Sequence, residues 1–194
     1  MPRLLALALA LLLAPAARAA APLQERKLFG GGMLYHVGFA PMSATFPGGH
    51  GLLHGFGGRL HFNLGPWLRA GAGGSRSTFP AERDALEGSG FELGRGYLYA
   101  EAALRGVRWR LGLGGHFGGG RATALQLVGG GGDTLFLADY RSHPTVLAGG
   151  LATLEWLATD TISLVLAAEG TWGSAIVEDH WLGPVVYAGV FFNK

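Results

Sequence analysis

The stretch YLYAEAALRGVRWRLGLGGHF, residues 97–117, decides the fold. It contains two runs in which apolar and polar residues alternate, joined by a break at Gly106. In the first run the two faces of an extended chain are distinct: Leu98, Ala100, Ala102 and Leu104 against Tyr97, Tyr99, Glu101 and Arg105. A period of two is typical of a β-strand with one apolar and one polar face. The stretch therefore predicts two antiparallel strands joined by a tight turn.

The same alternation recurs along the chain in blocks of similar length. Eight blocks can be marked: 33–46, 52–64, 67–79, 93–105, 107–119, 143–157, 161–173 and 181–193. Tight turns are expected at three places: Gly65-Pro66, Gly106 and Thr159-Asp160. Between them fall longer connections, notably 80–92 and 120–142, and the glycine runs in the second are interpreted as hinges of a surface loop. The pattern predicts eight antiparallel strands with short turns at one end and longer loops at the other.

The first 19 residues have the features of an export signal. A short basic start, Met1-Pro2-Arg3, precedes an unbroken apolar run, Leu4 to Leu13, and Ala17-Arg18-Ala19 fits signal-peptidase cleavage. The apolar run is too short for a transmembrane helix, which needs about 20 residues. The expected organisation is a signal peptide, 1–19, a short periplasmic segment, 20–28, and one domain, 29–194.

Composition excludes several classes of protein. The chain has 194 residues, of which 49% are hydrophobic and 14% charged, so it has enough apolar surface for one folded domain. It contains no cysteine, which excludes a disulfide scaffold and a thiolate zinc site. Without Arg3 and Arg18, 13 basic residues balance 13 acidic residues. No basic cluster suits a phosphate backbone, and nucleic acid is excluded as a partner.

The polar faces of the blocks indicate which side of the sheet is inside. They carry too few charges for a surface in water, and they combine glycine and alanine with single Arg, Glu, His and Tyr residues. That mixture suits the crowded interior of a small barrel, with the apolar face toward lipid. The blocks are also long enough to cross a bilayer, which takes about 9–11 residues per tilted strand. We therefore predict an all-β fold, a closed antiparallel up-and-down transmembrane β-barrel of eight strands.

Two sets of residues follow from this assignment. An interior polar network is expected from eight residues: His36, Arg59, His61, Arg69, Glu101, Arg110, Glu155 and Glu169. Aromatic girdles at the membrane interfaces are expected from Trp67, Trp109, Trp156 and Phe192 near the tight turns, and from Trp172 and Trp181 toward the opposite end. A turn at 47–50 would place His36 opposite His61 in the first hairpin.

With these features the chain resembles the small eight-stranded outer-membrane β-barrels of Gram-negative bacteria, of the OmpA transmembrane-domain type. The resemblance covers residues 29–194 and rests on the signal peptide, the eight amphipathic blocks and the alternation of turns and loops. It implies a location in the bacterial outer membrane, contact with its lipid and lipopolysaccharide, and recognition of the C-terminal strand by the barrel-assembly machinery. Residues 185–192, VVYAGVFF, look like that recognition signal, with Asn193-Lys194 after the last aromatic residue.

The expected function is a structural or surface-interaction role carried by the extracellular loops. The segments 80–92, 120–142 and 174–180 together hold eight acidic and three basic residues, which would suit divalent cations shared with lipopolysaccharide phosphates. Two alternatives stay open: a lipid A-modifying or other lipid-modifying enzyme, and a narrow ion or proton channel. Barrels of similar type that deacylate lipid A carry a His-x-Ser-Asn pattern. The nearest stretch in this sequence, Ser142-His143-Pro144-Thr145, matches that pattern poorly. No catalytic residue, metal site or cofactor is assigned.

Signal-peptidase cleavage is predicted after Ala19, because Ala17-Arg18-Ala19 follows the apolar run at the usual spacing. N-terminal sequencing of the protein recovered from membranes should begin at Ala20. A mature chain beginning beyond Leu23 would contradict this assignment.

Overall fold

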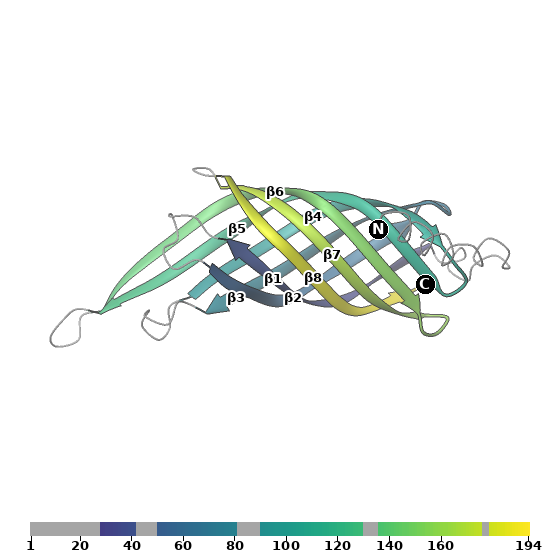
Figure 1. Cartoon of the computed structure of the whole chain (residues 1–194), viewed down its shortest axis with the longest axis horizontal. Coiled ribbons are helices and arrows are strands. Elements are labelled where there is room, and N and C mark those ends of the chain that lie inside the picture. Colours follow the sequence, from purple (N-terminus) through teal and green to yellow (C-terminus); the bar gives the residue numbers. More distant parts are fainter. Residues whose placement is uncertain (1–27, 42–49, 81–89, 130–135, 176–178) are drawn as a thin grey trace, which may run out of the picture.

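The protein is a closed barrel of eight antiparallel strands, seen in a computed structural model that describes residues 28–41, 50–80, 90–129, 136–175 and 179–194 (Figure 1). The strands are β1 (Phe29–Pro41), β2 (His50–Asn63), β3 (Leu68–Pro80), β4 (Gly90–Arg105), β5 (Trp109–Gly129), β6 (Phe136–Leu157), β7 (Ile162–Ala175) and β8 (Asp179–Asn193). Each strand pairs with its neighbours in the sequence, and β1 closes the barrel by pairing with β8. The predicted fold class is confirmed. Among the described residues, no helix is long and apolar enough to cross a membrane.

One end of the barrel carries the short turns, the start of β1 and the end of β8. The turns span 64–67, 106–108 and 158–161, at the three places the sequence predicted. Gly65 has a φ of 98°, a conformation that glycine adopts without the strain a side chain would cause. At the same end, the backbones of Phe29 and Lys194 exchange two hydrogen bonds, of 3.1 and 2.8 Å. We call this the turn end of the barrel, and the opposite end the loop end.

The hairpin of β5 and β6 is longer than the sequence predicted. The expected loop 120–142 is wrong, because the two strands remain paired from Arg121↔Pro144 to Gly129↔Phe136. Figure 1 shows this hairpin reaching beyond the ends of the other strands. The glycines of 118–120 do not act as loop hinges. A Cβ on Gly118 would lie 2.1 Å from the carbonyl oxygen of Gly96, so glycine there lets the backbones of β4 and β5 approach closely.

The register of the first hairpin also differs from the prediction. His36 pairs with Gly55 and His61 with Gly30, so the two histidines are not opposite each other. The connection is centred nearer the N-terminus than the predicted turn, because pairing begins at Pro41↔His50. The difference is an even number of residues, which preserves the faces of both strands. Both histidines are fully buried.

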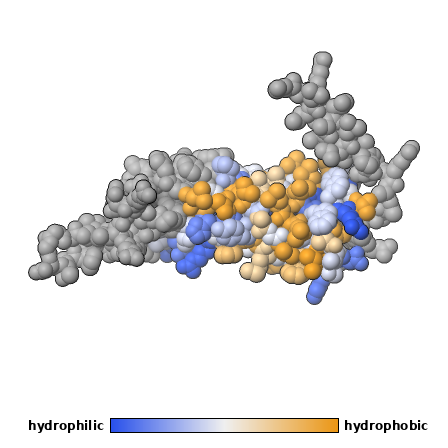
Figure 2. Space-filling view, turned by 60° about the horizontal axis from the view of Figure 1, so that its bottom comes forward, coloured by the Kyte–Doolittle hydropathy of each residue, from blue (hydrophilic) through white to orange (hydrophobic). Residues whose placement is uncertain are grey.

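The apolar face of the sheet is on the outside of the barrel. Along β2, Leu60 is 55% exposed and Phe62 is 50% exposed, whereas His61 between them is buried. On the face seen in Figure 2, apolar residues occupy the middle of the barrel, with polar residues toward its ends. An apolar surface of this extent is unfavourable in water, since each exposed Å² costs about 25 cal/mol, but it is favourable against lipid.

A cross-strand cysteine experiment tests the closure and the register together. Met33→Cys with Val190→Cys should form a disulfide across the β1–β8 seam, because these residues are paired. His36→Cys with His61→Cys should not, since six residues along a strand separate the positions by roughly 20 Å. Non-reducing gels of the folded protein give the answer, and a 36–61 crosslink would contradict the register.

Candidate functional site

The candidate site is the barrel interior, where polar side chains form two clusters. The turn-side cluster contains His61, Asn63, Arg69, Glu101, Arg110, Glu155, Ser163 and Asn193. The loop-side cluster contains His36, Arg59, Ser75, Ser77, Tyr97, Arg95, His116, Glu169, Thr171 and Tyr187. All the strands contribute, and the alternation in each strand turns these residues inward.

Arg69 organises the turn-side cluster. Its Nη2 donates to Oε2 of Glu155 at 2.8 Å, its Nη1 lies 3.5 Å from Oε1 of Glu101, and its Nε donates to Oδ1 of Asn63 at 3.1 Å. Arg110 donates from Nη1 to Oε1 of Glu101 at 2.5 Å. Two guanidinium groups thus face two carboxylates, which balances the charge where water is excluded.

Asn193 joins the end of the chain to the same cluster. Its Nδ2 donates to Oε1 of Glu155 at 3.2 Å and to Oγ of Ser163 at 2.8 Å. Its Oδ1 lies 3.3 Å from Nε2 of His61. Sequence reasoning missed this role, because Asn193 was noted only as a residue after the last aromatic of β8. The alternation in β8 could have revealed it, because Asn193 lies two residues after Phe191, whose side chain faces the interior.

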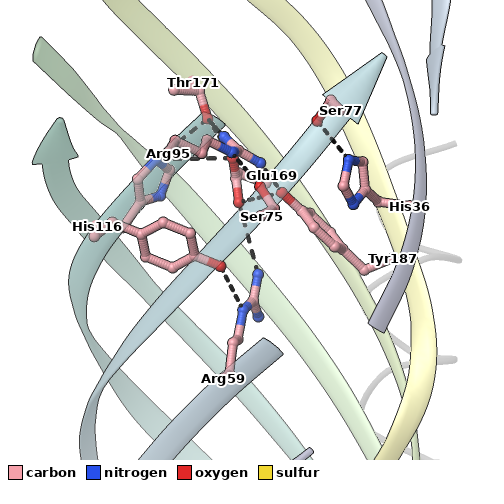
Figure 3. Close-up of polar contacts among 10 residues, drawn as sticks. His36, Arg59, Ser75, Ser77, Arg95, His116, Glu169, Thr171 and Tyr187 are labelled. Atoms are coloured by element: carbon pink, nitrogen blue, oxygen red, sulfur yellow. Dashed lines mark hydrogen bonds and ion pairs between the residues drawn. The ribbon is translucent and has the colours of Figure 1, made fainter. Parts of the chain in front are cut away.

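Glu169 is the centre of the loop-side cluster (Figure 3). It is ion-paired with Arg95, and it accepts hydrogen bonds from Thr171 Oγ1 at 2.5 Å and from the Tyr187 hydroxyl at 2.8 Å. The Nη2 of Arg59 lies 3.6 Å from its Oε2. Nε2 of His116 lies 3.8 Å from its Oε1. The buried carboxylate of Glu169 therefore accepts hydrogen bonds from several side chains at once.

The two arginines of this cluster use aromatic side chains as further partners. Arg59 donates from Nε to the Tyr97 hydroxyl at 2.9 Å, and its guanidinium carbon lies 4.9 Å from the ring centroid of Tyr187. Arg95 donates to Oγ of Ser75 at 2.8 Å and also contacts the Tyr187 hydroxyl. The sequence analysis did not assign Arg95 to the interior, although it lies an even number of residues from Glu101 in the same strand.

The structure places all the proposed network residues in the interior, but not in one group. Each is at most 2% exposed: His36, Arg59, His61, Arg69, Glu101, Arg110, Glu155 and Glu169. Arg69 is ion-paired with Glu101 and Glu155, and Arg110 is ion-paired with Glu101. Arg59 is ion-paired with Glu169 nearer the loop end. His36 contacts neither His61 nor Arg69; its Nε2 lies 2.6 Å from Oγ of Ser77.

The proposed girdle residues lie at both ends of the outer wall. Trp67 is 68% exposed, Phe192 57%, Trp156 48% and Trp172 45%, whereas Trp109 is half-buried. Trp109 pairs with Trp156 next to the turn 106–108, and its ring lies against Gly106. The side chain of Trp181 lies outside the described part of the structure.

The interior does not assemble the groups that hydrolysis or metal binding would need. Ser77 and His36 form a Ser–His hydrogen bond, yet both are fully buried, and Nδ1 of His36 has no hydrogen-bond partner among the described residues. A nucleophile and base without an orienting group and without access do not make a catalytic set. Within the described ranges, no three His, Asp or Glu side chains are grouped to hold a metal ion.

Comparison with known proteins places the fold. No protein-family model and no curated protein sequence matches the chain. Solved structures do match it: Neisserial surface protein A at 14% identity, with a TM-score of 0.60 over 86% of this chain and 97% of that one. Ail, the attachment invasion locus protein of Yersinia pestis, matches at 13% identity and a TM-score of 0.59, over 87% and 99%. The outer membrane protein OprG from Pseudomonas aeruginosa matches at 8% and 0.55, over 90% and 99%.

At these identities the likeness is one of fold. The chain has the fold of the small eight-stranded outer-membrane β-barrels, in agreement with the resemblance found from its sequence.

Removal of one ion-pair partner tests the turn-side cluster. Arg69→Ala should lower the free energy of unfolding by about 3–5 kcal/mol, because Glu155 would be left buried without its main cation. Urea unfolding of the protein in lipid vesicles measures the change. Arg76→Ala is the matched control, since the Arg76–Glu92 ion pair is exposed and its loss should have little effect. Equal stability of wild type and Arg69→Ala would contradict the assigned role of the cluster.

Proposed function

We propose that the protein is a bacterial outer-membrane barrel that anchors surface segments for interaction and does not transport large solutes. The observation that carries the proposal is the filled interior. Arg69, Arg110 and their two glutamates cross the barrel from β3, β4, β5 and β6 at the turn end. Arg59, Arg95 and Glu169 do so again nearer the loop end. Eight strands enclose a space that side chains just fill.

The outer wall supports the proposed location. Apolar residues surround the barrel, and aromatic residues are exposed at its two ends, as membrane–water interfaces favour. Closure of β1 on β8 pairs the backbone around the whole barrel, which the hydrocarbon layer requires. The export signal 1–19, lipid and lipopolysaccharide as surroundings, and recognition of β8 by the assembly machinery complete this proposal.

The topology supports an outward position for the loop end. If the amino end of the barrel remains in the periplasm after export, β1 runs outward, and the three tight turns return to the periplasm. The connections 42–49, 81–89, 130–135 and 176–178 then face the cell exterior, together with the projecting hairpin of β5 and β6. Two of the matching structures are described as a surface protein and as an attachment invasion locus protein, which supports a surface-interaction role here.

The filled interior gives less support to the alternative of a narrow channel. An ion crossing the barrel would have to pass both clusters, including the rings of Tyr97, Tyr99 and Tyr187, each at most 5% exposed. The lipid-modifying alternative would need a Ser–His pair open to lipid, whereas Ser77 and His36 face the interior.

Proteolysis of intact cells tests the surface role. Added trypsin should cut at Arg83, in the connection 81–89, while the strands stay protected by their pairing and by the membrane. Mass spectrometry of the membrane-embedded fragments locates the cut. A chain that is cut at Arg108, in the turn 106–108, but spared at Arg83 would have the opposite orientation, and the proposal would fail.

A second measurement tests the filled interior. The purified protein should migrate differently on gels before and after boiling, as a closed barrel does, and should give no large stepwise conductance in planar bilayers. Release of the protein by osmotic shock, or a steady solute-sized conductance, would contradict the proposal.

A further inference from the structure

Two arginines share one row on the outer wall near the loop end. Arg76 of β3 pairs with Gly94 of β4, and Gly94 pairs with Arg121 of β5. Residues paired across an antiparallel sheet share a face, so all three point away from the barrel interior. Both arginines are exposed, on the same face as the exposed ring of Phe56, which pairs with Arg76 from β2. Two cations therefore stand at the polar edge of the apolar belt.

The surface between the two arginines is open. A Cβ on Gly94 would meet nothing within 4 Å. The Cα atoms of Arg76 and Arg121 are two strand spacings apart, roughly 10 Å. Two guanidinium side chains on Cα atoms this far apart are long enough to reach a single anion placed above Gly94.

The charges around Gly94 favour an anion. Glu92 binds Arg76 from one side, through Nε at 2.6 Å and Nη2 at 2.7 Å. In this side-on pair Nη1 of Arg76 is not used by the carboxylate of Glu92. Arg121 forms no ion pair with another described residue. The group of Arg76, Glu92 and Arg121 thus has one uncompensated positive charge. Arg121 and Glu92 lie in the strands β5 and β4 and not in the connections where the sequence analysis placed them.

An apolar strip adjoins the arginines on the side of the turn end. The next outward row consists of glycines, Gly74↔Gly96↔Gly119, and the row after it presents Leu98 and Phe117, which are 69% and 64% exposed. The strip is shallow because its floor has no side chains. An anion attached to a hydrocarbon chain can contact both the arginines and the apolar strip. A free anion can contact the arginines only.

We propose that this surface binds the phosphate group of an outer-leaflet lipid between Arg76 and Arg121, with an acyl chain along the glycine strip. The inference rests on the proposed outer-membrane location and names one lipid contact within it. Guanidinium groups suit the oxygens of a phosphate, and charge-assisted hydrogen bonds are stronger at the edge of a low-dielectric layer than in water. The lipid is bound directly by arginine and needs no divalent cation.

Lipid A is the probe, because it carries phosphates and acyl chains on one molecule. Its binding to the folded protein in uncharged detergent is measured by native mass spectrometry at increasing lipid concentration. Arg121→Gln and the double variant R76Q/R121Q should bind roughly tenfold more weakly or worse, since each removes a hydrogen-bonded charge. Gly94→Leu should weaken binding similarly by filling the floor, although it retains both charges. Arg108→Gln, an exposed arginine at the turn end, is the matched control and should not change binding.

The outcomes separate this inference from the proposed function. Heat-shifted migration on gels shows that each variant is folded, and Gly94→Leu provides a second test if the double variant is not. Dephosphorylated lipid A should bind wild type as weakly as lipid A binds R76Q/R121Q. Equal binding by wild type and the arginine variants, or loss of wild-type binding in EDTA, would overturn the site. A protein that binds lipid A in this way but fractionates outside the outer membrane would instead overturn the proposed location.

Discussion

Closure of the sheet is the constraint on which the rest of the structure depends. A backbone in hydrocarbon has no water to satisfy its N–H and C=O groups, so each must find a partner within the chain. The pairing of β1 with β8 removes the last open edge. Once the sheet is closed, the alternation of side chains divides every strand between two unlike faces, an apolar wall outside and a narrow polar space inside. The positions of the arginines and of the tryptophans both follow from this division.

The interior is stabilised by combining large charged side chains with glycines. A Cβ on Gly112 would lie 2.7 Å from Oε2 of Glu101, and one on Gly73 would lie 2.6 Å from Cζ of Tyr97. The glycines therefore define the volumes that these side chains fill. Each carboxylate in turn is held by an arginine, as at Glu155 by Arg69. The close packing makes the ion pairs geometrically specific, and the ion pairs make the burial of charge tolerable.

The sequence predicted the fold well because period-two alternation is a local signal. The eight strands, the three tight turns and the inward face of residues such as Glu101 and Glu169 could be derived from it. Register could not, because it depends on where the connection 42–49 begins and not on the pattern within β1 or β2. The length of the β5–β6 hairpin was also missed. Glycine at 118 and 120 suggested a loop, yet a Cβ at these positions would lie 2.1 Å and 2.5 Å from carbonyl oxygens of the neighbouring strand β4. The register and the length of a hairpin thus depend on pairs of residues that lie far apart in the sequence.

The contact of Asn193 with Glu155 and Ser163 makes the turn-side ion network depend on the last strand of the barrel. Asn193 is the last residue of β8, and its backbone partner across the seam, Gly30, is the second residue of β1. The first and last strands must therefore meet before either the seam or the turn-side ion network can be completed. Contacts between residues so far apart in sequence form slowly, because the whole intervening loop has to be ordered first. A chain that ends a few residues early lacks more than a few contacts: it keeps an open edge and a buried carboxylate without its amide partner. The backbone seam and the ion network of the interior thus depend on the same meeting of the first and last strands.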